Sequence, residues 1–479
     1  EGTPGNKLPS YLAMQEFSAR DKNVVRNIVS DKVERAKEDF AGVVIESETE
    51  PEDNDDWKIR LDVDRKGNIY NTIDNALLIL ENDPYFKNRI AYDDFEKCEV
   101  AVRDLPWRKV VHINRRLTDN DDANIRHYLE KTYGISSSLK IRDAMLVLAN
   151  KTCFHPVRDY LRSLKWDGVK RVDTLFIEYM GAVDTPYVRA ITRKSLTAAV
   201  TRIFIPGAKF DYVTVLVGKQ GLKKSSLIAA LGRQWFTDSF STIKGKESFE
   251  QLQGVWLVEI AELAGLAKAE IESIKHFITK REDRYRVAFG RRTENFPRQC
   301  VFFATTNKKA FLKDPTGDRR YWPVMVHETT PTKNVMKDLT EYEIGQIWAE
   351  AVEFFKKGEP IYLSPELESA ATEIQKLHKE EHPWTGIIQQ YLDTKLPDNW
   401  AKMAHYERLS FLRGDDLDAE GTIYRDKVCI HEIWVEALNR RDTIDDRSAT
   451  AIRNIMANTP GWAEEPRMMR YGIFGRQRK

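Results

Sequence analysis

The chain has 479 residues, which is enough for two to four domains of about 100–200 residues each. Its composition of 42% hydrophobic and 31% charged residues, with a net charge of +1, is ordinary for a globular protein and shows no global basic excess for a nucleic-acid partner. With no apolar run near the roughly 20 residues of a membrane helix and no CxxC pair among its four cysteines, we expect a cytoplasmic protein without a membrane span, zinc or disulfides.

The first part of the chain predicts an irregular acidic leader over residues 1–58. It ends in a run, 46–56, with seven acidic residues and no basic one, which is typical of a solvated linker. Residues 59–205 predict a mainly helical N-terminal domain, because apolar residues recur at helical spacing and Thr118 can cap a helix that stops at Gly134. The helices expected here cover 72–81, 119–133, 140–149, 157–164 and 185–203, and two short strands are expected within 89–103.

Residues 206–328 predict an α/β domain. Apolar runs typical of buried strands occur at Val213–Val217, Val255–Glu259 and Val301–Thr305, and a helix is expected from Ser225. A strand, a loop and a helix followed by further apolar strands indicate a layered α/β core.

The loop after the first of these strands has the pattern of a phosphate-binding P-loop. The rule asks for Gly, four residues, Gly, Lys and then Ser or Thr, and Gly218, Lys224 and Ser225 meet it, while Lys223 replaces the second Gly. Backbone N–H groups of such a loop bind phosphates, the Lys adds a charge, and the Ser hydroxyl can ligate Mg²⁺. The alternative is a basic turn before a helix. The predicted nucleotide-binding residues are Gly218, Gln220, Gly221, Leu222, Lys223, Lys224, Ser225 and Ser226.

Acidic and amide side chains follow the two later strands. Glu259 and Glu262 are the only near pair of carboxylates, and ATP hydrolysis needs one for the Mg²⁺ shell and one for the attacking water. Asn307, after the third strand, can hold that water against the γ-phosphate. The alternatives are a solvated strand end and a turn Asn, and the sequence does not say which Glu does which task.

Two arginines, Arg319 and Arg320, stand on a turn within Gly317–Pro323. An arginine that reaches a neighbouring subunit's nucleotide would stabilise the charge of the transition state. The alternative is a salt-bridged loop.

The rest of the chain is expected to be helical. Residues 329–426 predict a helical lid and linker, with helices over 340–357 and 365–378. Residues 427–479 predict a helix over 430–439, a helix over 446–458 and a basic hairpin, which is the order of a winged-helix module. The tail 467–479 has five basic residues and no acidic one, so we expect it to contact duplex DNA as a wing; the alternative is a basic terminus that contacts nothing.

These motifs, in this order, resemble the virulence-associated protein E family, which belongs with superfamily 3 helicases and poxvirus-type primase-helicases. The likeness runs over residues 142–326 and rests on the P-loop, WLVEIAEL at 256–263, the helix with Ile274–Phe277, the segment 279–307 and GDRRYWPV at 317–324. It implies a hexameric AAA+ ring in the replication of a phage or mobile element of a bacterial host. It also implies ATP between subunits, Mg²⁺ on Ser225 and Glu259, Asn307 and both glutamates in cis, and an arginine in trans.

The resemblance also implies that the segment between the acidic strand and the Asn strand is a pore hairpin on single-stranded or forked DNA. Residues 280–298 contain seven Lys or Arg and three acidic residues, and the alternating apolar residues are typical of strands. The alternative is a charged surface hairpin. The expected DNA contacts are Arg286, Arg291, Arg292 and Arg298 in this segment and Lys275 on the helix before it, for which a solvated helix face is the alternative.

An ATP-driven DNA helicase is therefore the leading interpretation, with a primase domain or protein as a possible partner. Two others stay open: a P-loop NTPase that remodels or loads a replication protein, and a DNA-binding interference factor with little ATPase activity, which the Lys223 departure would fit.

Overall fold

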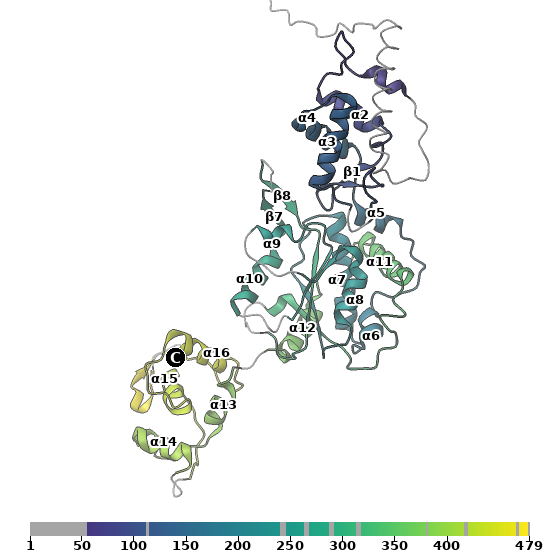
Figure 1. Ribbon diagram of the computed structural model, residues 1–479. Helices are drawn as coiled ribbons and strands as arrows, with labels where there is room; N and C mark the ends of the chain where they lie inside the picture. The colour runs from purple at the N-terminus through teal and green to yellow at the C-terminus, as the bar shows by residue number, and fades with distance from the viewer. Residues whose placement is uncertain are drawn as a thin grey trace, which may run out of the picture. The chain divides into compact units, whose positions relative to one another are not determined.

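The structure is a computed structural model that describes residues 55–111, 115–239, 246–262, 268–286, 292–312, 318–379, 382–415, 420–465 and 469–477. It divides into two compact units, one running to Asn307 with Arg319–Thr372 added, and the other made of Lys308–Asp318 and Glu373–Lys479 (Figure 1). The leader expected over 1–58 lies mostly outside the described residues. No helix in these ranges is both long and apolar enough to span a membrane.

The N-terminal part of the first unit is mainly helical, as expected, and adds a small sheet with the strand order β2-β1-β3. Thr118 accepts a backbone N–H at a helix start, as predicted, and Thr72 does the same at the start of another helix. Trp57 is buried in this core, so the domain begins before the expected start at residue 59. The elements are η1 (Asp55–Arg60), α2 (Ile73–Asn82), β1 (Ile90–Asp93), β2 (Cys98–Ala101), α3 (Asp119–Tyr133), α4 (Ser138–Lys151), β3 (Cys153–Phe154), α5 (Pro156–Ser163), α6 (Leu175–Met180) and α7 (Pro186–Phe204).

A parallel five-stranded sheet forms the centre of the first unit, so the expected α/β class is confirmed. Its strand order is β10-β4-β9-β6-β5, and every neighbouring pair is parallel. Strands β4, β6 and β9 are buried along their whole length, which is why each reads as a continuous apolar run. The strands are β4 (Val213–Val217), β5 (Phe236–Thr237), β6 (Leu257–Ile260), β9 (Val301–Thr306) and β10 (Tyr321–Met325).

Helices cover both faces of this sheet, with α7, α8 and α11 on one face and α10 on the other (Figure 1). Two further strands, β7 and β8, form a separate antiparallel hairpin. The remaining elements of this part are α8 (Lys224–Gly232), η3 (Arg233–Trp235), α9 (Glu247–Glu250), α10 (Lys268–Thr279), β7 (Glu282–Tyr285), β8 (Glu294–Pro297), η5 (Asp318–Arg320), α11 (Glu341–Lys356) and α12 (Pro365–Leu377).

Helix α11 belongs to the α/β core and is not a separate lid. Its Trp348 is fully buried, packs against Trp256 with ring centroids 4.1 Å apart, and donates its indole N–H to the carbonyl of Leu231 at 3.0 Å. The domain boundary expected at residue 328 therefore falls inside this unit. The sequence shows that α11 has an apolar stripe, but it does not show which part of the protein the stripe packs against.

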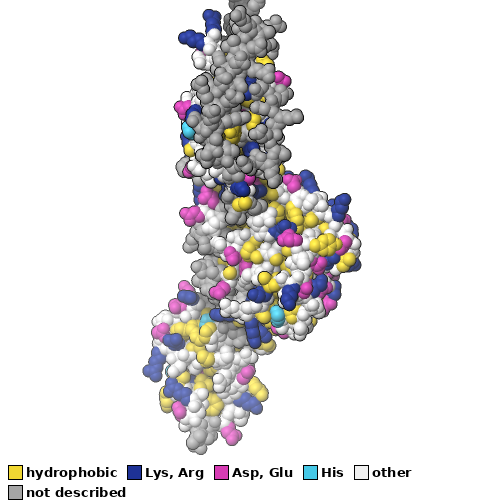
Figure 2. All heavy atoms as spheres, turned by 45° about the vertical axis from the view of Figure 1, so that its right-hand side comes forward, with side chains coloured by type: hydrophobic (Ala, Val, Ile, Leu, Met, Phe, Trp, Pro, Cys, Tyr) yellow, Lys and Arg dark blue, Asp and Glu magenta, His cyan; other side chains and the backbone are white. Residues whose placement is uncertain are grey.

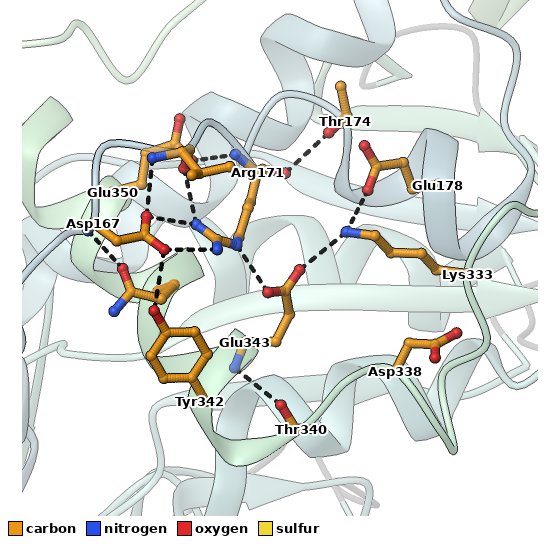
Figure 3. Close-up of polar contacts among 12 residues, drawn as sticks. Asp167, Arg171, Thr174, Glu178, Lys333, Asp338, Thr340, Tyr342, Glu343 and Glu350 are labelled. Atoms are coloured by element: carbon orange, nitrogen blue, oxygen red, sulfur yellow. Dashed lines mark hydrogen bonds and ion pairs between the residues drawn. The ribbon is translucent and has the colours of Figure 1, made fainter.

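An ionic cluster ties the start of α11 to the segment before α6 (Figure 3). Arg171 donates to both carboxylate oxygens of Asp167 at 2.8 Å and to Glu343 at 2.8 Å, and Lys333 bridges Glu343 and Glu178 at 3.0 and 2.7 Å. The hydrogen bonds from Arg171 lower the pKa of the Asp167 carboxyl. The cluster fixes α6, and the backbone amides of His327 and Thr329 bond to the carbonyls of Met180 and Gly181 at its end, at 2.7 and 2.9 Å.

The second unit has its own apolar core, built around Ile388, Ile433, Trp434, Ile452 and Ile455. The predicted order of two helices and an antiparallel hairpin is present at its C-terminal end, but the first helix is short and continues as a π-helix. Its elements are α13 (Thr385–Asp393), η6 (Trp400–Lys402), α14 (His405–Arg413), α15 (Ile430–Glu432), the π-helix η7 (Ile433–Ala437), α16 (Asp446–Ala457), β11 (Met469–Arg470), η8 (Gly472–Phe474) and β12 (Arg476–Gln477).

Candidate functional site

The carboxyl ends of β4, β9 and β6 meet at one edge of the sheet and bring the predicted site residues together. Val217 pairs with Thr306, Ile260 pairs with Ala304, and the N–H of Gly218 donates to the carbonyl of Thr306 at 3.0 Å. Ligands of open parallel sheets bind at this edge, where the strand order reverses. Along the chain, β4 is followed by β5, which lies at one end of the sheet. In contrast, β9 is followed by β10, which lies on the other side of β4.

The loop after β4 has the backbone conformation of a tight phosphate-binding turn. Gly221 has a φ of 85°, and a side chain at Gly218 would come within 2.6 Å of the Val326 side chain. Lys223, which stands where the motif has Gly, has a φ of 59° and a ψ of 25° and caps α8. A non-glycine residue in this left-handed region costs about 1–2 kcal/mol. Lys223 therefore adopts the backbone conformation that the turn needs, and its side chain is exposed.

Lys224 is the first residue of α8, and its side chain folds back over the loop. Its ammonium donates to the carbonyls of Gly218 at 2.7 Å and Lys219 at 2.8 Å. Burial lowers the pKa of Lys224, and the nearby Glu259 charge opposes that shift. A buried cation whose hydrogen bonds within the described residues go to neutral carbonyls at a helix N-terminus is suited to an anionic ligand.

Three oxygen-bearing side chains meet beside it. The Ser225 and Thr305 hydroxyls both donate to Oε1 of Glu259, at 2.6 and 2.7 Å. Glu259 is 1% exposed, and its Oε2 has no hydrogen-bond partner among the described residues. A buried carboxylate with one free oxygen next to a hydroxyl is an oxygen-ligand set of the kind that Mg²⁺ prefers.

Thr305 is the site residue that the sequence analysis missed. It lies on β9, two positions before Asn307, which follows the strand, and alternate positions along a strand point to the same side of a sheet. That spacing is the only sequence signal for it, because its contact with Glu259 depends on the pairing of β9 with β6.

Replacing Thr305 with valine should lower ATP turnover by about tenfold, because Glu259 loses one of its two hydroxyl donors and a hydrogen bond to a charged group contributes about 1.5–3 kcal/mol. Thr305→Ser keeps the donor and should retain most activity. Turnover measured across a Mg²⁺ titration should show a higher Mg²⁺ requirement for the valine variant. Equal turnover and Mg²⁺ dependence in the wild type and the valine variant would mean that Thr305 has no positioning role.

Glu262 and Asn307 lie just beyond the ends of β6 and β9, and both are exposed. Glu262 has a φ of 51°, which is an unfavourable backbone conformation for any residue other than glycine. Glu259, by contrast, is inside the strand and bonded to Ser225. The two carboxylates therefore occupy different environments, one buried next to the P-loop serine and one open to a ligand.

Arg319 and Arg320 lie at the opposite edge of the sheet from the P-loop. Tyr321, which follows them, pairs with Val213 at the start of β4, whereas the P-loop begins after Val217 at its end. Five strand residues at ~3.3 Å each put about 15 Å between the two edges. Neither guanidinium can contact a phosphate in the P-loop of its own chain.

The basic hairpin is present, and its strands pair from Glu282 with Pro297 to Tyr285 with Glu294. Stacking of Tyr285 on Phe296, with ring centroids 4.5 Å apart, supports it. Arg286 and Arg292 are exposed where the strands end. The predicted contact Arg291 lies outside the described residues.

Two of the predicted DNA contacts have side chains that are buried in this structure, so the prediction that they are available to DNA is wrong. Arg298 is 3% exposed, pairs with both oxygens of Asp283 at 2.7 and 2.9 Å, and anchors the base of the hairpin. Lys275 is 5% exposed, with its ammonium 5.9 Å from the ring centroid of Tyr321. A charge run along the chain does not distinguish a solvated arginine from one with a buried partner.

Comparison with known proteins gives one family. The model of the virulence-associated protein E-like domain matches residues 161–380, a range that contains the P-loop, Glu259, Asn307 and Arg320. No curated protein matches the chain.

Three solved structures of the NrS-1 C-terminal region are similar at a low level. An apo structure of residues 305–718 is 13% identical, with 69% of this chain and 80% of that chain covered and a TM-score of 0.35. An A-form apo structure is 15% identical, with 65% and 76% covered and a TM-score of 0.36. A further A-form apo structure is 14% identical, with 81% and 94% covered and a TM-score of 0.37. These scores are too low to establish a shared fold.

Proposed function

Because the chain carries a virulence-associated protein E-like domain over residues 161–380, we propose that it is an ATP-hydrolysing DNA helicase that acts as a ring translocase in the replication of a phage or mobile element. The sheet domain would be an AAA+-type P-loop core. A primase domain or protein is the partner that this role suggests.

One observation carries the proposal: the buried Glu259 carboxylate meets the P-loop serine, Ser225, at 2.6 Å beside Lys224. Lys224 would bind the β- and γ-phosphates of ATP, and Ser225 with Glu259 would hold Mg²⁺. The bound metal would neutralise charge that develops on the phosphates. Glu262 and Asn307, exposed at the neighbouring strand ends, would orient the attacking water.

The strand order supports the AAA+ assignment. Strand β9, which ends at Asn307, lies between the P-loop strand β4 and the acidic strand β6. An amide at the end of β9 is therefore placed between the phosphate loop and the carboxylates, which is the position a water-orienting group needs.

The position of Arg319 and Arg320 supports a ring. An arginine about 15 Å from its own P-loop can stabilise the transition state only at a neighbour's nucleotide. Copies arranged head to tail would place one edge of the sheet against the opposite edge of the next copy, and such an interface closes into a ring when the rotation allows. A hexamer is the ring size that the family resemblance suggests.

Arg319→Ala or Arg320→Ala should reduce ATP turnover by about 10³-fold or more, the range measured for arginines that act in trans. Mixing either variant with Lys224→Ala subunits should restore part of the activity, since each mixed interface can pair an intact P-loop with an intact arginine. The readout is phosphate release across a range of mixing ratios. Full turnover by an isolated monomer at high dilution would exclude an arginine in trans.

Exposed arginines of the β7–β8 hairpin would grip the DNA backbone. Arg286 and Arg292 lie where β7 ends and just before β8 begins, and phosphate contacts of this kind carry no base information. Forked DNA with one labelled strand tests the proposal: the wild-type chain should displace the strand only with hydrolysable ATP. ATP hydrolysis without displacement would favour a remodelling NTPase, and displacement or binding without hydrolysis would remove the ATPase assignment.

A further inference from the structure

Helix α16 of the second unit has one buried face and one polar face that nothing in its own unit covers. Ala449, Ile452 and Ile455 are buried in the core around Trp434. The opposite side presents the exposed residues Arg447, Thr450, Arg453, Asn454, Ala457 and Asn458. The only acidic residue in the helix is Asp446, its first.

We propose that this face enters the major groove of duplex DNA and reads base edges, so that the second unit recognises a specific sequence independently of the ATP site. Arg is suited to guanine and Asn to adenine, each through two hydrogen bonds. No hydrogen bond or ion pair occupies the side chains of Arg453 or Asn454 within the described part of the chain. The Thr450 hydroxyl donates to the carbonyl of Asp446 at 2.7 Å, which leaves its methyl group for contact with a thymine methyl.

The turn before the helix is held in place. Trp434 donates its indole N–H to the carbonyl of Asp442 at 2.8 Å, and its own carbonyl accepts from the N–H of Arg440 at 3.1 Å. Asp445 caps α16 by accepting from the N–H of Ser448 at 2.6 Å. A helix fixed by its turn and by its apolar face can present side chains in one defined geometry, as base reading requires.

Shape and chemistry favour duplex DNA over other occupants. A helix of 12 residues is about 18 Å long and fits the ~12 Å-wide major groove of B-DNA, whereas the major groove of duplex RNA is too deep and narrow for side chains to read. The centre of the face holds Thr450, Asn454 and Ala457, without the aromatic anchor that a protein interface requires. On the face that Figure 2 shows, basic and acidic side chains are interspersed. The exposed Arg440 and Arg441 in the turn before the helix are placed for phosphate contacts.

The test is selection from a random duplex library with the full-length chain, followed by titration of the selected duplex and a scrambled duplex. We expect one consensus site, bound at least about tenfold more tightly than the scrambled duplex. The double variant Arg453→Ala, Asn454→Ala should lose this difference while binding the scrambled duplex as the wild type does. Arg453→Lys combined with Asn454→Ala, which keeps the charge, should lose most of the preference as well. Lys402→Ala, a charge removed elsewhere in the unit, and Lys224→Ala, in the ATP site, should both keep it.

Three results would overturn the proposal: no consensus after selection, a preference that survives in both double variants, or equal weakening on selected and scrambled duplexes, which would mean phosphate contact only. Circular dichroism of each variant checks that α16 remains folded. The Lys224→Ala variant should keep the sequence preference while losing ATP hydrolysis, so failure of the DNA-reading proposal and failure of the helicase proposal give different outcomes.

Discussion

Lys224→Ala should reduce ATP turnover by at least about 100-fold, the loss seen when one preorganised charge-stabilising group is removed from an active site. The ammonium of Lys224 is held by two loop carbonyls at 2.7 and 2.8 Å, so it is already at the mouth of the loop where phosphates would bind. Without the Lys224 ammonium, helix α8 offers no positively charged side chain to the γ-phosphate. Phosphate release with Mg²⁺ and saturating ATP is the measurement.

Lys209→Ala is the matched control for this variant, because Lys209 is an exposed lysine that precedes β4 and pairs with Asp211 at 3.5 Å. It should hydrolyse ATP at the wild-type rate. Thermal unfolding of Lys224→Ala separates loss of chemistry from loss of fold. Wild-type turnover in a folded Lys224→Ala chain would remove the P-loop assignment and, with it, the ATPase.

The second large effect is expected at the buried carboxylate. Glu259→Gln keeps the size of the side chain but removes its charge, so the hydroxyls of Ser225 and Thr305 still have an acceptor while a divalent cation loses its anion. Turnover should fall by about 100- to 1,000-fold with nucleotide binding retained. Fluorescent-nucleotide titration with and without Mg²⁺ should show that Mg²⁺ strengthens binding to the wild type much more than to the variant.

Glu262→Gln is the informative comparison, since this side chain is exposed and outside the strand. It should also lower turnover, by about 100-fold or more as expected for a general base, but leave the Mg²⁺ dependence of binding unchanged. Different Mg²⁺ responses of the two variants would assign the metal to Glu259 and the water to Glu262. Normal hydrolysis by both would place the acidic site elsewhere.

The helices and strands whose formation depends on residues close together in the sequence were predicted correctly. Thr118 caps a helix where expected, because a cap depends only on the next three residues, and the helices expected over 72–81 and 185–203 are capped by Thr72 and Thr185. Strands β4 and β9 were found because burial on both faces makes a strand continuously apolar. Strand β5 has only two residues and carries no such pattern.

Features that depend on distant partners were missed or misplaced. The strand order and the packing of α11 join residues far apart in the chain, so no spacing predicts them. In the site, Lys224, Ser225 and Glu259 were predicted because the first two belong to one local motif at the start of α8 and the third follows an apolar run in the sequence. Thr305 was not, since it meets Glu259 across the β9–β6 pairing. Arg298 was assigned to DNA because its buried partner, Asp283, lies across the hairpin and 15 residues away.

Particle images of the full-length chain with Mg²⁺, a slowly hydrolysed ATP analogue and single-stranded DNA test whether the protein works as a ring translocase. We expect closed rings in which each nucleotide lies between Lys224 of one copy and Arg319 or Arg320 of the next, with one DNA strand in the channel beside the β7–β8 hairpins. Monomers that bind the nucleotide with no second copy beside it, or rings whose DNA runs away from the hairpins, would contradict it.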